Sequence, residues 1–217
     1  MASRELGEIP AGGRGGAISL EVRWILHGPI PQAVLGWMGL FDAWIEQRED
    51  RYLVDPAAPD LGVKIKGGTE LDVKAFRGDV GVLEVPGGGR GVIERWEKWR
   101  FPFSTVALPS AGSSWVALWK TRHRRSFRLT GDELVERPVV EAELPGCSVE
   151  VTAFTVGTDA WWTLALEAGG EPQGLEAVLR ATAEMVFREP RPPGLELELE
   201  DSTSYPRWLA STSPHTH

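Results

Sequence analysis

The feature that most constrains this chain is the alternation of apolar and charged residues in short runs separated by Gly, Pro and Asp. The run 18–26, ISLEVRWIL, carries Glu21 and Arg23 at alternate positions, with Leu20, Val22 and Trp24 between and beside them. Successive side chains of a β-strand point to opposite faces, so the acid and the base share one face. The pattern predicts strands that have one apolar face and one charged face.

Similar β-like runs recur along most of the chain, at 50–55, 61–67, 70–78, 80–85, 113–129, 140–146, 147–157 and 160–170. The stretch 92–101, VIERWEKWRF, fits either a strand or a helix. Apolar residues at helical spacing predict helices over 31–47 and 175–187. About eight strands joined by tight turns imply antiparallel pairing, so the predicted class is α+β.

Composition narrows the class of protein. The formal net charge of -8 argues against a nucleic-acid binder, and the single cysteine, Cys147, excludes an intramolecular disulfide. No apolar run approaches the ~18 residues that cross a bilayer, and the first residues lack the apolar core of a signal peptide. We therefore expect a cytoplasmic protein that does not bind membranes, and the sequence leaves a homodimer open. Six Trp residues are expected in the core or against helices: Trp96, Trp99, Trp115, Trp119, Trp161 and Trp162.

Three segments divide the 217 residues. Residues 1–17 are Gly-rich and polar, which predicts disorder. The patterned region, 18–190, forms the main domain. Residues 191–217 form a C-terminal tail, in which Tyr205 and Trp208 either fold back on the barrel or contact a partner.

Charge is unevenly distributed over the predicted strands. Bases dominate the charged face of the central strands: Lys64, Lys66, Lys74, Lys120, Arg122 and Arg124. Carboxylates on the same face are Glu150 and Glu167, with Asp72 and Glu97 as weaker candidates. If the apolar faces pack outward against helices, the charged faces line a barrel that can hold one small ligand. If the apolar faces pack inward, the charged faces are ordinary solvated surface.

The alternation by itself favours the solvated surface, as in an unrelated barrel. Two features favour the cavity instead. The signs of charge are segregated by strand, whereas solvated surfaces usually mix them. Basic strands inside an acidic protein also indicate an anionic ligand. The Gly-rich stretch 87–91 lacks the Lys-Ser/Thr of a P-loop, so side chains would have to hold phosphate.

The order of these motifs resembles the CYTH superfamily, also called triphosphate tunnel metalloenzymes, over roughly residues 18–187. That family opens with a strand bearing Glu-x-Glu-x-Lys, and SLEVR at 19–23 stands in its place. The motifs that follow in the family's order are DRYLVD (50–55), LGVKIKGG (61–68), ELDVKAF (70–76), WKTRHRR (119–125), SVEVTAF (148–154) and WWTLALEA (161–168).

The resemblance implies an antiparallel, eight-stranded tunnel with flanking helices. It also implies metal-dependent hydrolysis of a triphosphate-containing small molecule or a polyphosphate, with Mg²⁺ or Mn²⁺ as cofactor. The phosphate-binding residues it implies are Arg23, Lys64, Lys66, Lys74, Lys120, Arg122 and Arg124. The metal ligands it implies are Glu21, Glu150 and Glu167. Arg and Lys suit a polyphosphate, and Mg²⁺ prefers oxygen ligands, so the chemistry is consistent.

Three departures from the family pattern bear on catalysis. Ser19 stands where the family has its first Glu, and Arg23 replaces the Lys. Ala165 shares a face with Glu167, where the family often has a second carboxylate. The alternative function is therefore a catalytically degenerate module that binds a polyanion or a protein partner without turnover, and the sequence does not settle whether the protein is an enzyme.

Overall fold

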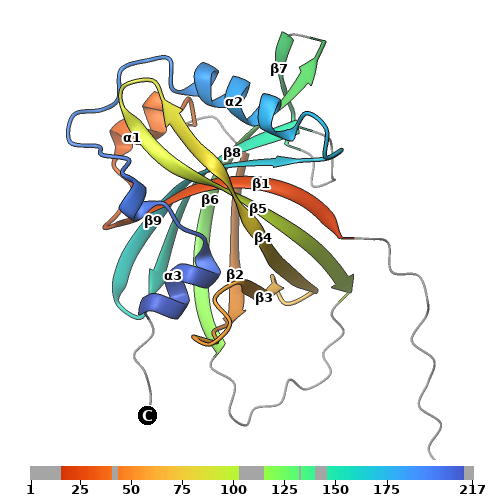
Figure 1. Ribbon diagram of the computed structural model, residues 1–217. Coiled ribbons are helices and arrows are strands. Elements are labelled where there is room, and N and C mark those ends of the chain that lie inside the picture. The colour runs from red at the N-terminus through yellow and green to blue at the C-terminus, as the bar shows by residue number, and fades with distance from the viewer. Residues whose placement is uncertain (1–15, 41–43, 103–114, 132, 140–145, 213–217) are drawn as a thin grey trace, which may run out of the picture.

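The computed structural model describes residues 16–40, 44–102, 115–131, 133–139 and 146–212, most of which form a closed β-barrel (Figure 1). The strands are β1 (Ala17–His27), β2 (Trp44–Leu53), β3 (Leu61–Lys66), β4 (Glu70–Val85), β5 (Gly89–Pro102), β6 (Trp115–Thr130), β7 (Glu133–Arg137), β8 (Gly146–Val156) and β9 (Asp159–Gly169).

Eight of these strands close into the barrel in the order β2-β3-β4-β5-β1-β9-β8-β6, and β6 pairs with β2 to complete the ring. The remaining strand, β7, pairs with β6 outside the ring. Every pairing is antiparallel. The predicted α+β class, with an antiparallel eight-stranded barrel and flanking helices, is confirmed.

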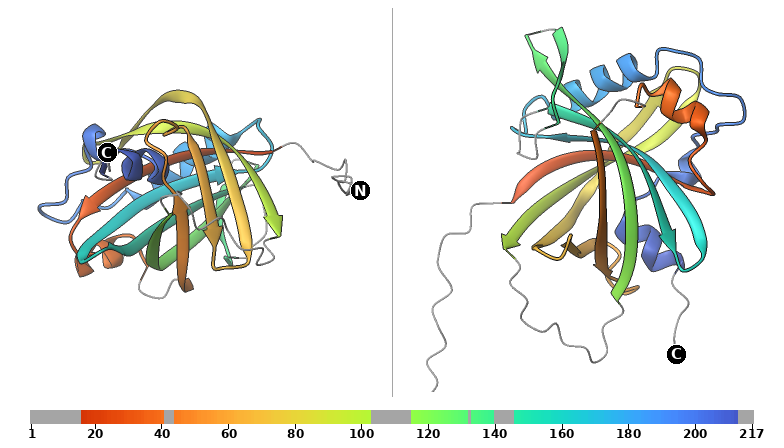
Figure 2. Two further views of the ribbon diagram at one scale, coloured as in Figure 1. Left: turned by 90° about the horizontal axis from the view of Figure 1, so that it is seen from below. Right: turned by 180° about the vertical axis from the view of Figure 1, so that it is seen from behind.

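In the described part of the chain, three α-helices and one 3₁₀-helix cover the barrel: α1 (Gln32–Trp37), α2 (Leu175–Val186), α3 (Tyr205–Thr212) and η1 (Leu199–Asp201). Figures 1 and 2 show α1 and α2 together on one side of the barrel and α3 at its opposite end. In the part of the chain that the structure describes, no helix combines the length and apolar character needed to cross a membrane.

The main hydrophobic core lies outside the barrel wall, between the strands and the helices. Val22 of β1, Val149 of β8 and Leu164 of β9 are fully buried there. The apolar side of α2, which includes Leu179, packs into the same cluster. Each such side chain contributes roughly 1.5–3 kcal/mol when it is buried. The apolar faces of these strands therefore point outward, and the charged faces must point into the barrel.

The expected helix at 31–47 is wrong beyond its first half. The helix α1 ends at Trp37, and Trp44–Leu53 form the strand β2, so residues 44–47 are extended. The ambiguous stretch 92–101 belongs to the strand β5. The expected strands at 70–78 and 80–85 are one strand, β4, with an irregular register between Phe76 and Gly81. Gly78 lies there at φ 112°, a conformation that glycine adopts without strain.

The tryptophan expectation holds in part. Trp96 and Trp162 are buried, as expected. Trp119 is 58% exposed on the outside of β6, so the prediction was wrong for this residue. The expectation of disorder over 1–17 falls mostly on 1–15, outside the described residues, and so does most of the expected strand 140–146.

We expect Gly146→Ala to destabilise the protein by about 1–3 kcal/mol, because overpacking a tight contact forces the backbone to shift. A Cβ at Gly146 would lie 2.3 Å from the backbone oxygen of Phe127. Gly169 is the register partner of Gly146, and a Cβ there would meet nothing within 4 Å, so Gly169→Ala is the matched control. Urea denaturation measures both variants; equal stabilities would contradict the close approach of β8 to β6.

Candidate functional site

The inner face of the barrel encloses a cavity of about 920 Å³. Ten basic residues line it: Arg23, Arg48, Lys64, Lys66, Lys74, Lys98, Arg100, Lys120, Arg122 and Arg124. Five acidic residues line it: Glu21, Glu46, Asp72, Glu150 and Glu167. Among the described residues that line the cavity, basic side chains thus outnumber acidic ones two to one, although the whole chain has a net charge of -8.

The structure brings together all the residues predicted for the site. The seven predicted phosphate-binding residues and the three predicted metal ligands all line the cavity. Alternation explains this, because Arg122 and Arg124 share the inner face of β6 while His123 between them does not line the cavity. Their roles in binding phosphate or metal remain predictions.

Sequence reasoning missed the inner face of β2 and part of that of β5. Glu46, Arg48 and Tyr52 of β2 line the cavity. Glu46 lay inside the expected helix 31–47, and Arg48 lay between that helix and the expected strand 50–55. Lys98 and Arg100 were missed because the sequence of 92–101 fits either a strand or a helix, so its inner face could not be assigned.

Glu97 was expected on the inner face of the barrel, and this prediction is wrong. Its carboxylate accepts hydrogen bonds from Arg77, at 2.6 and 2.8 Å, in an exposed contact between β4 and β5. Lys98, the next residue along β5, faces the cavity instead.

Glu150 of β8 is the centre of one ion-pair cluster. It accepts hydrogen bonds from Arg122, which also donates to Glu46. Arg23 and Arg124 approach the Glu150 carboxylate to 3.6 and 4.0 Å. Burial by itself would raise the pKa of Glu150, but Arg122 and Arg23 outweigh burial and hold the pKa well below its ordinary value. Glu150 is therefore a permanent anion at neutral pH.

Asp50 of β2 is the centre of a second cluster. Its side chain is fully buried and lies 2.8 Å from Arg48, 3.4 Å from Lys64 and 3.5 Å from Lys120. Burial opposes ionisation of Asp50, but the lysines and Arg48 outweigh burial and lower its pKa. Lys120 also donates a hydrogen bond of 2.7 Å to the Tyr52 hydroxyl. This cluster joins β2, β3 and β6 through one carboxylate.

The third cluster contains two of the predicted metal ligands. Glu21 of β1 and Glu167 of β9 are register partners and line the same wall of the cavity. Glu21 accepts hydrogen bonds from Lys74 at 2.7 Å and from the Ser19 hydroxyl at 3.1 Å. Glu167 accepts one from Lys98 at 2.9 Å, and that ammonium is the main cause of its lowered pKa.

These carboxylates do not form a ready metal site. Among the described residues, no group of three or more His, Cys, Asp or Glu side chains is arranged to hold a metal ion. Glu21, Glu150 and Glu167 each form an ion pair with Lys or Arg. The predicted Mg²⁺ or Mn²⁺ site therefore does not fit the carboxylates in this arrangement.

Three cations in the cavity are only partly neutralised by acids. Burial lowers the pKa of Lys64 and holds that of Lys120 well below its ordinary value, despite the nearby Asp50. Burial and then the neighbouring Arg122 lower the pKa of Arg124. A bound anion would favour the charged forms of all three side chains.

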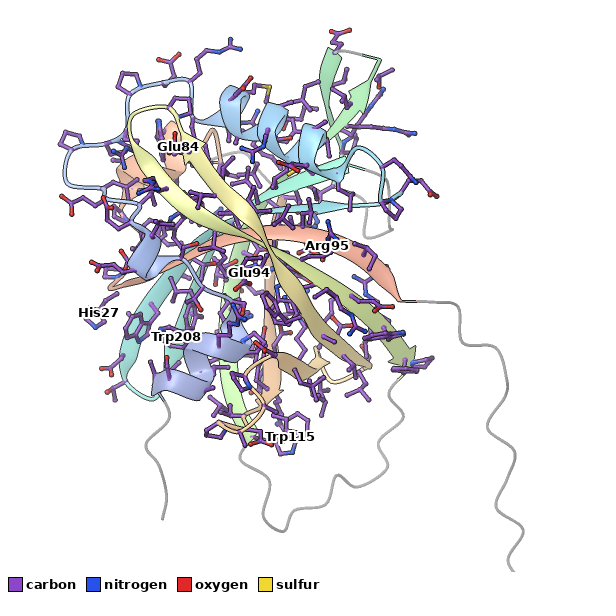
Figure 3. All side chains as sticks on the ribbon, in the orientation of Figure 1. His27, Glu84, Glu94, Arg95, Trp115 and Trp208 are labelled. Atoms are coloured by element: carbon purple, nitrogen blue, oxygen red, sulfur yellow. The ribbon has the colours of Figure 1, made fainter. Side chains whose placement is uncertain are left out.

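The helix α3 closes one end of the barrel, which resolves the question left open for the C-terminal tail. Tyr205 and Pro206 of α3 line the cavity. The Lys120 ammonium lies 3.7 Å from the centroid of the Tyr205 ring, and the Arg23 guanidinium lies 4.8 Å from it. Trp208 of α3, labelled in Figure 3, packs against Trp161 of β9. The two ring centroids are 4.9 Å apart. The tail therefore folds back on the barrel and forms part of the cavity wall.

Comparisons with known proteins detect similarity only at the level of structure. No protein-family model matches the chain, and no curated protein matches its sequence significantly. The PH1819 protein from Pyrococcus horikoshii OT3 is 12% identical, with a TM-score of 0.44, over 89% of this chain and 99% of that one.

Two further similar structures are named as triphosphatases. The S. pombe Pct1 RNA triphosphatase, in complex with the Spt5 CTD, is 11% identical over 79% of this chain and 80% of that one, with a TM-score of 0.41. HpAC1 from Hippeastrum, a putative adenylyl cyclase with a dominant triphosphatase activity, is 11% identical over 83% of this chain and 92% of that one, with a TM-score of 0.37. At these values, the similarities do not assign an activity to this chain.

We expect Asp50→Asn to destabilise the protein by about 3–5 kcal/mol at pH 7, because the buried Lys120 and the partly buried Arg48 and Lys64 lose a shared counter-charge. The pKa of Asp50 is lower in the folded protein than its ordinary value of 3.8. Its stabilisation is therefore complete above that pH and is lost as the pH falls further. Urea denaturation at pH 7 and at about pH 3 should show the difference from wild type shrinking in acid.

The exposed Asp159 at the start of β9 provides the control, since Asp159→Asn should change stability little at either pH. An Asp50→Asn variant as stable as wild type at pH 7 would show that the cluster around Asp50 contributes nothing to stability.

Proposed function

We propose that the barrel is a tunnel that binds the triphosphate group of a small molecule or an inorganic polyphosphate. The observation that supports this is the cavity lined by ten basic and five acidic residues in a chain with a net charge of -8. A low-dielectric wall around a cluster of one charge sign concentrates the field and attracts the opposite ion. The volume, about 920 Å³, lies within the range of small-molecule sites.

The kind of anion follows from the arrangement of the cations. Arg124 can bind two oxygens of one phosphoryl group, and Lys64 and Lys120 provide compact point charges. Lys64 and Arg124 lie on different strands of the wall, β3 and β6. A ligand with several connected phosphoryl groups contacts more of these cations than a single phosphate does.

We expect Arg124→Gln to weaken binding of tripolyphosphate about tenfold or more, because a charge-assisted hydrogen bond contributes roughly 1.5–3 kcal/mol. The matched control is Arg125→Gln, one residue along β6. Arg125 is bound outside the cavity to Glu136, at 2.7 Å, and to the backbone oxygen of Met38. Titration calorimetry without divalent metal gives the affinities; equal losses in both variants would show that the inner face of β6 does not bind the anion.

Metal-dependent hydrolysis of the bound ligand is the second candidate function. Glu21 and Glu167 favour it, because they lie side by side on β1 and β9, and Mg²⁺ needs only a few carboxylates when it keeps waters. Their ion pairs with Lys74 and Lys98 are the reason for placing hydrolysis second. Binding without turnover is then the function of the tunnel as it stands, with a small-molecule polyanion as the partner.

A substitution at Ser19 distinguishes the two functions. Ser19 lines the cavity and donates to Glu21, so Ser19→Glu would add a third carboxylate to that wall. If the missing carboxylate limits hydrolysis, we expect Ser19→Glu to increase Mn²⁺-dependent phosphate release from tripolyphosphate, ATP or thiamine triphosphate about tenfold over wild type. Ser19→Gln is the control, because a glutamine side chain has the same size as glutamate but is neutral. No release from any of the three proteins would rule out hydrolysis and leave a binding module.

A further inference from the structure

The strand β7 lies outside the closed barrel, at an edge of the sheet. It pairs with residues 126–130 of β6 in a regular register, and with no other strand in the described part of the chain. Figures 1 and 2 show β7 and the end of β6 projecting from the barrel. The outer edge of β7 therefore presents main-chain amide and carbonyl groups with which another strand can pair.

The two faces of β7 differ in what they contact. Leu134 packs against the main hydrophobic core, and Glu136 forms an ion pair of 2.7 Å with an arginine of β6. These contacts fix β7 on its own protomer. Glu133, Val135 and Arg137 lie on the opposite face, because side chains alternate along a strand. The side chains of Glu133 and Arg137 are exposed, and neither forms an ion pair with a described residue.

The sequence of β7 is complementary to itself when a second copy runs antiparallel to it. About a two-fold axis through Val135, Glu133 of each copy lies opposite Arg137 of the other, and the two Val135 side chains lie opposite each other. Residues directly opposite in an antiparallel pair share a face, and opposite charges there stabilise the pair. A shift of register in either direction loses both Glu–Arg pairs, so charge selects this register.

The pattern of charge favours a second copy over a strand of another protein. Charged side chains on an edge strand usually discourage pairing with another chain. In β7 the two unpaired charges have opposite signs and are placed symmetrically about Val135, so a second copy neutralises both at once. Pro138 follows Arg137 and has no amide N–H to donate, so the pairing is limited to the five residues of β7.

We propose that the outer edge of β7 is a dimer interface, at which β7 of a second copy pairs antiparallel about Val135 and extends the sheet across both protomers. Each dimer contains two ion pairs between Glu133 and Arg137, one contact between Val135 side chains, and main-chain hydrogen bonds. A pair of five-residue strands is smaller than a standard interface of about 1,600 Å², so the dimer dissociates on dilution. Formation of this dimer does not depend on what the tunnel binds.

Analytical ultracentrifugation of the full-length protein at low salt, over concentrations up to millimolar, tests the interface. We expect wild type to convert from monomer to dimer as its concentration rises. Glu133→Arg and Arg137→Glu should each weaken the dimer about tenfold or more, because each substitution places like charges opposite each other twice. The double variant exchanges the two charges, so its dimer should have the wild-type affinity to within about threefold.

The control for Arg137→Glu is Arg188→Glu, which makes the same change of charge at an exposed position beyond α2 and should leave the dimer unchanged. A wild type that stays monomeric at millimolar concentration would leave the edge to a strand of another protein and overturn the inference. A dimer that neither single substitution weakens, or a double variant no stronger than the single variants, would also overturn it.

Formation of a disulfide tests the position of the two-fold axis. Val135→Cys should yield a covalent dimer when oxidised glutathione is the oxidant, because residues directly opposite have Cβ atoms about 4.5–5.5 Å apart, close to the range of a disulfide. Wild type should not be linked, since Cys147 is buried. Asp159→Cys, at the exposed start of β9, is the matched control. Equal yields of covalent dimer from Val135→Cys and Asp159→Cys would overturn the inference.

Discussion

The pairing of charges inside the barrel is the constraint on which the rest of the structure depends. The main helices cover the apolar outer faces of the strands, so the charged faces have no position except the interior. A buried carboxylate without a partner costs several kcal/mol. Glu150, Asp50 and Glu167 each lie against Lys or Arg from other strands. These ion pairs connect strands that are distant in the sequence, and they make a charged interior compatible with a stable fold.

After this pairing, basic side chains remain in excess along the described wall of the cavity. This excess of positive charge distinguishes a binding site from a neutral interior. Burial lowers the pKa values of Lys64, Lys120 and Arg124, and the nearby carboxylates offset this effect only in part. A polyphosphate would supply the missing negative charge and could also compete for the lysines that now bind Glu21 and Glu167. If the tunnel binds a polyphosphate as proposed, binding would therefore be linked to rearrangement of these ion pairs.

The faces of the strands were predictable because alternation is a local property. Arg122 and Arg124 could be assigned to one face and His123 to the other from spacing alone. The strand β2 was not predictable in the same way: Trp37, Met38 and Ile45 fit a helical spacing, and the extended conformation of Trp44–Leu53 is stabilised by pairing with β3 and β6. Glu46 was missed for this reason, and Arg48 because it lay between the expected helix 31–47 and the expected strand 50–55. The same ambiguity in β5 put Glu97, instead of Lys98, on the inner face.

By itself, the sequence determined the antiparallel strands, the segregation of basic residues onto one face of them, and seven of the ten described cations that line the cavity. Only the tertiary structure decided that this face points inward, because that depends on whether helices cover the other face. It also decided that each predicted metal ligand is paired with a base, since Lys74 and Lys98 reach Glu21 and Glu167 from other strands. The closed end of the tunnel was likewise decided in three dimensions: Tyr205 meets Lys120 only because the chain returns to the barrel after its last strand.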